Sequence, residues 1–274
     1  MRLFDDARYA ELAQQYGSAY NVNDPLPHTV IDNFLPIEVA ERILGEFPDS
    51  KQINWLRFDR HHSKKPATKE DRELGDFTRE LLTHMNSAAC LRFLEQLTGI
   101  KGLIGNPYFE GGGLHQIERG GFLKMHVDFN YHRRLQLDRR INLIVYANKD
   151  WQEEYNGHLQ LWDREMKGCV KKILPVFNRC VIFNTTGFSW HGHPDRLECP
   201  GDRTRKSMAL YYYTNGRPEE EKGETHGTVW QERQKPGVVK TAVAKVLQTT
   251  ARVIETPTAM MRKAATALTV RKAG

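Results

Sequence analysis

Residues 141–148, with the sequence INLIVYAN, belong to a series of short apolar runs that begins after Gly102. The other runs are 113–118 (GLHQIE), 122–128 (FLKMHVD), 158–163 (HLQLWD), 171–176 (KKILPV), 179–184 (RCVIFN) and 207–214 (SMALYYYT). Glycine, asparagine, aspartate or proline separates most of them, which is typical of the strands of a β-sandwich or barrel. The sequence therefore predicts seven or eight strands in the second half of the chain.

Helical patterns precede these strands. The predicted helical regions are 5–17, the second half of 28–49, and about 70–97. Gly17 and Gly99 are predicted to end the first and the last of these helices. Residues 51–66 have no periodicity and are predicted to form a loop.

The order of elements indicates the fold class. Helices come first and strands follow, whereas a doubly wound α/β fold would alternate them. We expect a mainly β (α+β) protein built on a double-stranded β-helix, that is, a cupin-like jelly roll. The expected division is an N-terminal helical support region (1–100), a jelly-roll core (101–218) and a basic C-terminal tail (219–274), in which the spacing of apolar residues predicts an amphipathic helix.

The positive charge of the chain is concentrated in its tail. The net charge is +6, and residues 235–274 contribute +7 through eight basic residues and Glu255, so the rest of the chain carries −1. A nearly neutral body argues against a nucleic-acid partner. The tail is expected to contact protein or, alternatively, the surface of an anionic membrane. The acidic N-terminal sequence does not resemble a signal peptide, and we expect a cytoplasmic protein.

One tripeptide in the apolar runs has the spacing of a metal site. His126 and Asp128 form an H-x-D pair, and residues i and i+2 of a strand project to the same side. Two imidazoles and one carboxylate on one face of an iron ion leave three positions open for chemistry. The third ligand would come from another strand. His191 follows the run 179–184 and is the candidate, with His193 as the alternative.

Arg205 opens the last run of the series, 14 residues after His191. A guanidinium group binds a carboxylate through two parallel hydrogen bonds, as the distal carboxylate of 2-oxoglutarate would require. An isolated arginine at the end of a strand more often faces solvent. Arg205 therefore indicates a 2-oxoglutarate site only together with the H-x-D pair.

These segments together resemble the prolyl-hydroxylase-like 2-oxoglutarate/Fe(II)-dependent dioxygenases. The resemblance extends from about residue 112 to 217 and rests on GGFLKMHVDFN, RRINLIVYANKDW, GHLQLWD, RCVIFN, SWHGHP and TRKSMALYYYT. It implies that His191 is the third iron ligand and that Tyr146 shares the cosubstrate carboxylate with Arg205, as in the hypoxia-sensing prolyl hydroxylases. It also implies Fe(II), 2-oxoglutarate and O2 as cofactor and cosubstrates, with ascorbate keeping the iron reduced.

The chain departs from the family pattern after residue 155. Asn156 replaces the first glycine of a common GGxL segment, and His158 fills its variable position. Further candidates for contact with substrate, cosubstrate or iron ligands are Asn130, His115 (or its neighbour Gln116), Arg140 and His193. Substrate contacts are also expected from residues 57–65 and 105–113.

The resemblance implies hydroxylation of an unactivated C–H bond, with a prolyl-type residue in a peptide or protein as the first expectation. The same chemistry on a small molecule (an amino acid, sugar, lipid or natural product) is an alternative. A metal-binding jelly roll of cupin type without this chemistry would not need Arg205 or Tyr146. A non-catalytic binding protein that kept the barrel is a further alternative, and the intact set of three ligands argues against it.

Overall fold

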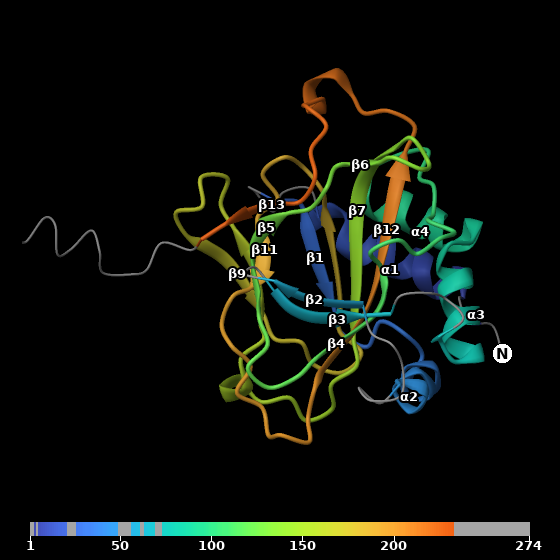
Figure 1. The fold of residues 1–274 in the computed structure, drawn as a ribbon. Coiled ribbons are helices and arrows are strands. Elements are labelled where there is room, and N and C mark those ends of the chain that lie inside the picture. The colour runs from blue at the N-terminus through green and yellow to red at the C-terminus, as the bar shows by residue number, and fades with distance from the viewer. Residues whose placement is uncertain are drawn as a thin grey trace, which may run out of the picture. The chain divides into compact units, whose positions relative to one another are not determined.

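The computed structural model describes residues 3, 5–20, 26–48, 56–60, 63–68 and 73–232 (Figure 1). The predicted amphipathic helix of the basic tail lies outside these residues. No helix in the described part of the chain combines the length and the apolar character needed to cross a membrane.

Four α-helices and two 3-10 turns are described. They are α1 (Asp6–Tyr20), α2 (Ile37–Glu46), α3 (Asp76–Met85), α4 (Ala88–Thr98), η2 (Glu153–Tyr155) and η3 (Glu219–Glu221). The helical region predicted over 70–97 is thus two helices, separated near Asn86. Gly99 ends α4 with a φ of 76°, as predicted. The prediction that Gly17 ends α1 was wrong, because α1 continues to Tyr20. A Cβ at Gly17 would lie 3.5 Å from the carbonyl oxygen of Leu97, an ordinary van der Waals distance, so α1 packs against α4 at this position.

The described strands form one antiparallel network. They are β1 (His28–Ile31), β2 (Leu56–Arg60), β3 (Ser63–Ala67), β4 (Gly113–Ile117), β5 (Leu123–Val127), β6 (Tyr131–His132), β7 (Leu137–Tyr146), β8 (Leu159–Trp162), β9 (Cys169–Ile173), β10 (Cys180–Asn184), β11 (His191–His193), β12 (Arg205–Thr214) and β13 (Val229–Gln231). Their order is β1-β10-β7-β12-β4-β3-β5-β11-β8-β9, with β13 on β5, β2 on β3 and β6 on β7. The jelly-roll prediction is confirmed by this all-antiparallel order and by the solved structures compared below.

The prediction of a loop over 51–66 was wrong for residues 56–60 and 63–66. Residues 56–60 and 63–67 form the hairpin β2–β3. The second strand of that hairpin bridges β4 through Ala67 and β5 through Ser63. These two strands therefore form because they pair with strands that are distant in the sequence, and the local sequence pattern does not predict them.

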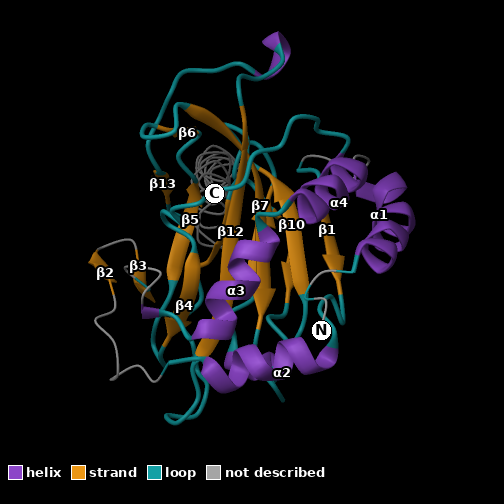
Figure 2. Cartoon of the chain, turned by 90° about the vertical axis from the view of Figure 1, so that its right-hand side faces the viewer, coloured by secondary structure: helices purple, strands orange, loops and turns teal. Residues whose placement is uncertain are grey.

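The large sheet has two different faces. One face packs against the helices and contributes to the main core, as Figure 2 shows for the helices in front of the strands. Its buried side chains on β7 and β12 include Leu143, Val145, Met208, Leu210 and Tyr212. Because successive residues of a strand point to opposite faces, the residues between them point into the interior of the roll.

The other half of the roll carries β5 and β11 side by side. His191 is paired with His126 in the register of these two strands. A Cβ at Gly192 would lie 2.7 Å and 2.8 Å from the carbonyl oxygens of Lys124 and Leu123. Glycine at this position therefore permits the close approach of the two strands that carry the candidate metal ligands.

The long strand β7 contains a β-bulge near its start. Tyr212 of β12 is paired with Ile141 and Tyr213 with Arg139, so Arg140 is an extra residue on β7. Regular alternation would place Arg139 and Asn142 on opposite faces. The extra residue allows both side chains to reach the interior of the roll, where they meet Asp128.

Candidate metal and cosubstrate site

Three side chains, from β5, from the residue directly after it and from β11, converge in the interior of the roll. The ligand atoms of His126, Asp128 and His191 all lie within 4.8 Å of one another. The Nε2 atom of His126 is 3.5 Å from Oδ1 of Asp128, and that of His191 is 3.4 Å from Oδ2. In the part of the chain that the structure describes, this is the one cluster of its kind, and His193 is not a member of it.

Both imidazole rings are oriented by hydrogen bonds on the side away from Asp128. Nδ1 of His126 is 2.9 Å from the carbonyl oxygen of Lys124, and Nδ1 of His191 is 2.8 Å from that of Ser189. A carbonyl accepts, so each Nδ1 carries a proton, and in the neutral form of each ring the Nε2 atom has a lone pair. Burial, and then the neighbouring His191, lower the pKa of His126, which favours the neutral ring.

The Asp128 carboxylate is held by two side chains of β7. Oδ2 accepts hydrogen bonds of 2.8 Å from Arg139 Nη2 and from Asn142 Nδ2, and Asn142 Oδ1 in turn accepts from Arg139 Nε. Burial alone would raise the pKa of Asp128, but the Arg139 guanidinium holds it well below its usual value. The carboxylate is therefore ionised.

This donor set suits a divalent metal ion. Two imidazole lone pairs and an ionised carboxylate point at one small volume, and lone pairs that face a carboxylate repel it unless a cation lies between them. Two histidines and one carboxylate on one face are the ligands that non-haem Fe(II) sites use.

A second cluster in the same interior contains a buried cation. Arg205, the first residue of β12, is 4% exposed, and its Nε donates to the carbonyl oxygen of Gly157 at 2.8 Å. Its Nη2 is 3.3 Å from the hydroxyl of Tyr146 on β7. No acidic side chain in the described residues pairs with Arg205, and burial lowers its pKa. A buried cation without a protein counter-ion is suited to bind an anion.

The strand register places His115 in the same row as Tyr146. Ser207 of β12 is paired with Tyr146 on one side and with His115 on the other. Directly paired residues project to the same face, so His115 lies on the face of Tyr146 and Arg205. Gln116 is on the opposite face and donates to the Thr204 hydroxyl at 2.9 Å. Between the two alternatives for a cosubstrate contact, this geometry favours His115.

The remaining sequence candidates lie in other surroundings. Asn130 binds the C-terminal segment, donating to the Glu224 carbonyl at 2.8 Å. Arg140 is engaged by Glu221 at 2.8 Å. His193 is 3% exposed at the end of β11, opposite Leu123, beyond an irregularity in the register.

The segment that departs from the family pattern keeps a glycine-like backbone. Asn156 has a φ of 59° and a ψ of −151°, a conformation that is costly for any residue with a Cβ. Its side chain donates to the Arg196 carbonyl, which helps to hold this conformation. His158 pairs with the exposed Glu153 at 2.6 Å, so its imidazole points away from the metal cluster.

Comparison with known proteins agrees with this geometry. Residues 112–246, which include both clusters, match the model of the 2OG-Fe(II) oxygenase superfamily. This region of the chain is therefore a 2OG-Fe(II) oxygenase domain. This oxygenase therefore uses Fe(II), 2-oxoglutarate and O2, and it is a 2-oxoglutarate-dependent dioxygenase. A search of curated protein sequences found no match.

Two solved structures show the same fold. A prolyl-4-hydroxylase from Pseudomonas putida is 17% identical, with a TM-score of 0.52 over 73% of this oxygenase and 100% of that protein. A prolyl hydroxylase from Trichoplax adhaerens, in complex with a peptide of a hypoxia-inducible factor, is 18% identical. Its TM-score is 0.50, over 76% of this oxygenase and 91% of that protein.

Sequence patterns did not single out Arg139, Asn142 or Trp230. Arg139 and Asn142 share a face only because of the bulge in β7. Trp230 lies in a charged stretch without periodicity, yet its ring stacks on His126 with the centroids 4.9 Å apart. Arg139 and Asn142 lie in the segment 139–151 that resembles the family, but the resemblance did not indicate that they bind Asp128.

We predict that Arg139→Met weakens the binding of Mn(II) or Co(II) by about tenfold to a hundredfold, the range found when a residue that holds a metal ligand is lost. The reason is that Asp128 loses its main cationic partner. Isothermal calorimetry measures the affinity, and thermal unfolding is recorded in parallel because breaking a buried pair also costs about 3–5 kcal/mol of stability. Arg133→Met, a change of an exposed arginine, is the control. Unchanged affinity in a folded Arg139→Met protein would contradict the role given to Arg139.

Proposed function

We propose that this oxygenase is a hydroxylase in which His126, Asp128 and His191 bind Fe(II). Arg205 and Tyr146 bind the distal carboxylate of 2-oxoglutarate. One observation carries the proposal: two imidazole Nε2 atoms face an ionised carboxylate, while in the same interior lies a buried arginine that pairs with no acidic side chain among the described residues. A cupin-type metal protein without this cosubstrate has no need of such an arginine.

The chain's own residues would orient and hold the reactants. Carbonyl groups fix the two imidazoles, and Arg139 and Asn142 fix Asp128, so the ligand set is arranged before the metal binds. Arg205 would bind the cosubstrate carboxylate through its guanidinium, and the Tyr146 hydroxyl would donate to the same carboxylate. When bound, Fe(II) with 2-oxoglutarate and O2 supplies the oxidising power that inserts oxygen into a C–H bond, with succinate and CO2 as by-products.

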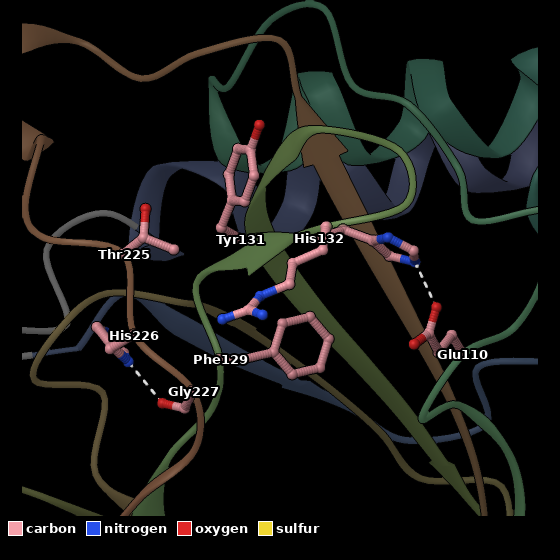
Figure 3. A pocket seen from close by; sticks show the side chains of 8 residues that line it. Glu110, Phe129, Tyr131, His132, Thr225, His226 and Gly227 are labelled. Atoms are coloured by element: carbon pink, nitrogen blue, oxygen red, sulfur yellow. Dashed lines mark hydrogen bonds and ion pairs between the residues drawn. The ribbon is translucent and has the colours of Figure 1, made fainter.

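A cleft lies at the turn that follows Asp128. Its volume is about 200 Å³, and it is lined by Glu110, Phe129, Tyr131, His132, Arg133, Thr225, His226 and Gly227. Figure 3 shows the His132–Glu110 pair on one side and the segment 225–227 on the other. Phe129 directly follows Asp128 in the sequence. We propose that substrate approaches the iron through this cleft, and Glu110 then belongs to the contacts expected from 105–113.

The proposed substrate is a prolyl-type residue in a peptide or protein. The motifs shared with prolyl hydroxylases and the common fold support it, and aromatic side chains such as Phe129 and Tyr131 suit an apolar ring. The small volume of the cleft favours a small polar molecule as the second candidate. Use of ascorbate, a cytoplasmic location, membrane or protein contacts of the tail, and substrate contacts from 57–65 stay predictions.

Arg205→Met should raise KM for 2-oxoglutarate by about tenfold to a hundredfold, the equivalent of one or two hydrogen bonds to a charged group. The kcat at saturating cosubstrate should change much less, because the interaction is made equally before and during the reaction. Lys206→Met changes the neighbouring cation of the same strand, whose side chain projects to the opposite face, and should leave KM unchanged. The measurement is succinate formation against cosubstrate concentration. An unchanged KM in Arg205→Met would exclude Arg205 as the anchor.

The substrate class is tested by coupling succinate release to product mass. Proline-containing peptides and free amino acids, sugars and lipids are offered separately with Fe(II) and 2-oxoglutarate. We expect peptides with proline to accelerate succinate formation and to gain one oxygen atom on that residue, whereas matched peptides with alanine in place of proline should not. Acceleration by a small molecule alone would replace the first candidate with the second.

A further inference from the structure

The strand β5, which carries His126 and leads directly to Asp128, is paired on one edge with the last described strand of the chain. β13 runs antiparallel to β5, with Trp230 opposite His126. The contacts continue beyond the strands in the same register. Lys124 binds Glu232 at 2.7 Å, and the side-chain oxygen of Asn130 accepts from the backbone of His226 at 2.9 Å. The segment 224–232 thus runs beside residues 124–130, that is, most of β5 and the turn that follows it.

This C-terminal segment, residues 217–232, is also anchored before it reaches β5. The Arg217 side chain is 6% exposed and donates to the carbonyl oxygens of Arg139 and Thr185. Glu221 pairs with Arg140 at 2.8 Å. The anchors lie on β7 and on the end of β10, so the segment crosses from the large sheet to the ligand strand (Figure 1).

Trp230 contacts a proposed iron ligand directly. The rings of Trp230 and His126 are stacked, with an interplanar angle of 29° and centroids 4.9 Å apart. The His191 ring is 4.3 Å from the His126 ring, so His126 has two aromatic neighbours. His191 is oriented differently, by an edge contact with Phe183 of β10 at 4.8 Å. The core of the roll thus supports one histidine and the C-terminal segment supports the other.

We propose that Trp230 is a positioning residue of the iron centre and that the C-terminal segment is a structural part of that centre. The Nδ1 hydrogen bond to Lys124 fixes one edge of the His126 ring, and the indole limits tilting of the ring plane. Together they keep Nε2 directed at the metal position. The inference rests on the proposed function, because it takes His126 as an iron ligand.

The test is a Co(II) titration of the full chain, followed both by the visible absorption of the ion and by indole fluorescence. Trp230→Ala should bind Co(II) about three- to tenfold more weakly than the wild type, the range expected for loss of one aromatic pair. Trp230→Phe should recover most of the affinity, because it keeps a ring on His126. Co(II) should quench part of the indole fluorescence of the wild type. The part that comes from Trp230 should be missing from the fluorescence of Trp230→Phe.

Val229→Ala is the matched control, because Val229 is in the same strand, is 44% exposed and faces away from His126. It should bind Co(II) like the wild type. Trp230→Leu, which keeps apolar cover without a ring, replaces Trp230→Ala if that variant does not unfold cooperatively. Equal affinity in wild type and in Trp230→Ala, or equal weakening in Val229→Ala, would overturn the role of Trp230.

The wild type also tests the proposed function separately. If it bound no Co(II), or bound it equally well after His191→Ala, the iron site itself would fail, and the inference with it. If Co(II) binding depends on His191 but not on the aromatic ring at position 230, the role of Trp230 would be overturned and the proposed iron site would stand.

Discussion

The carboxylate of Asp128 is the charge around which the interior of this protein is organised. A largely buried carboxylate is costly unless it is paired and hydrogen-bonded, and here Arg139 and Asn142 meet that need from β7. Their joint approach requires the extra residue in β7, and the pairing of β11 with β5 brings His191 to the same carboxylate. The position of the candidate iron site thus depends on the three strands β5, β7 and β11, and the carboxylate remains ionised and accessible to a cation.

The division of the large sheet into two faces determines where chemistry is possible. Leu143, Val145 and Met208 face the helices and form an apolar core, whereas the alternate residues Asn142, Tyr146 and Arg205 face the roll. The helices cover one face of the sheet and shield it from water. The polar and charged side chains are gathered on the other face, in the interior of the roll. The same alternation places His115 beside Tyr146 and Ser207. The C-terminal segment completes the edge of β5, which would otherwise present unpaired backbone groups next to two ligands.

Much of this arrangement follows from the sequence because it depends on local alternation. The seven apolar runs, the H-x-D pair and the arginine that opens the last strand are regular features, and the fold they predict is the one observed. Arg139 could not be assigned from alternation, since a bulge is specified by tertiary pairing. Trp230 is one aromatic residue in a charged stretch, and only the pairing of β13 with β5 gives it a role. The hairpin over 56–67 and the continuation of α1 past Gly17 likewise depend on distant contacts, with β4 and β5 in one case and α4 in the other.

The most direct measurement is an anaerobic titration of the protein with Fe(II) and 2-oxoglutarate, followed by the visible charge-transfer absorption of a keto acid bound to iron. His191→Ala and His193→Ala are compared with the wild type, since the two histidines are two residues apart and one of them belongs to the cluster. The account predicts that the band appears in the wild type and in His193→Ala and is lost in His191→Ala. A band that survives the loss of His191, or that requires His193, would contradict the assignment of the iron site.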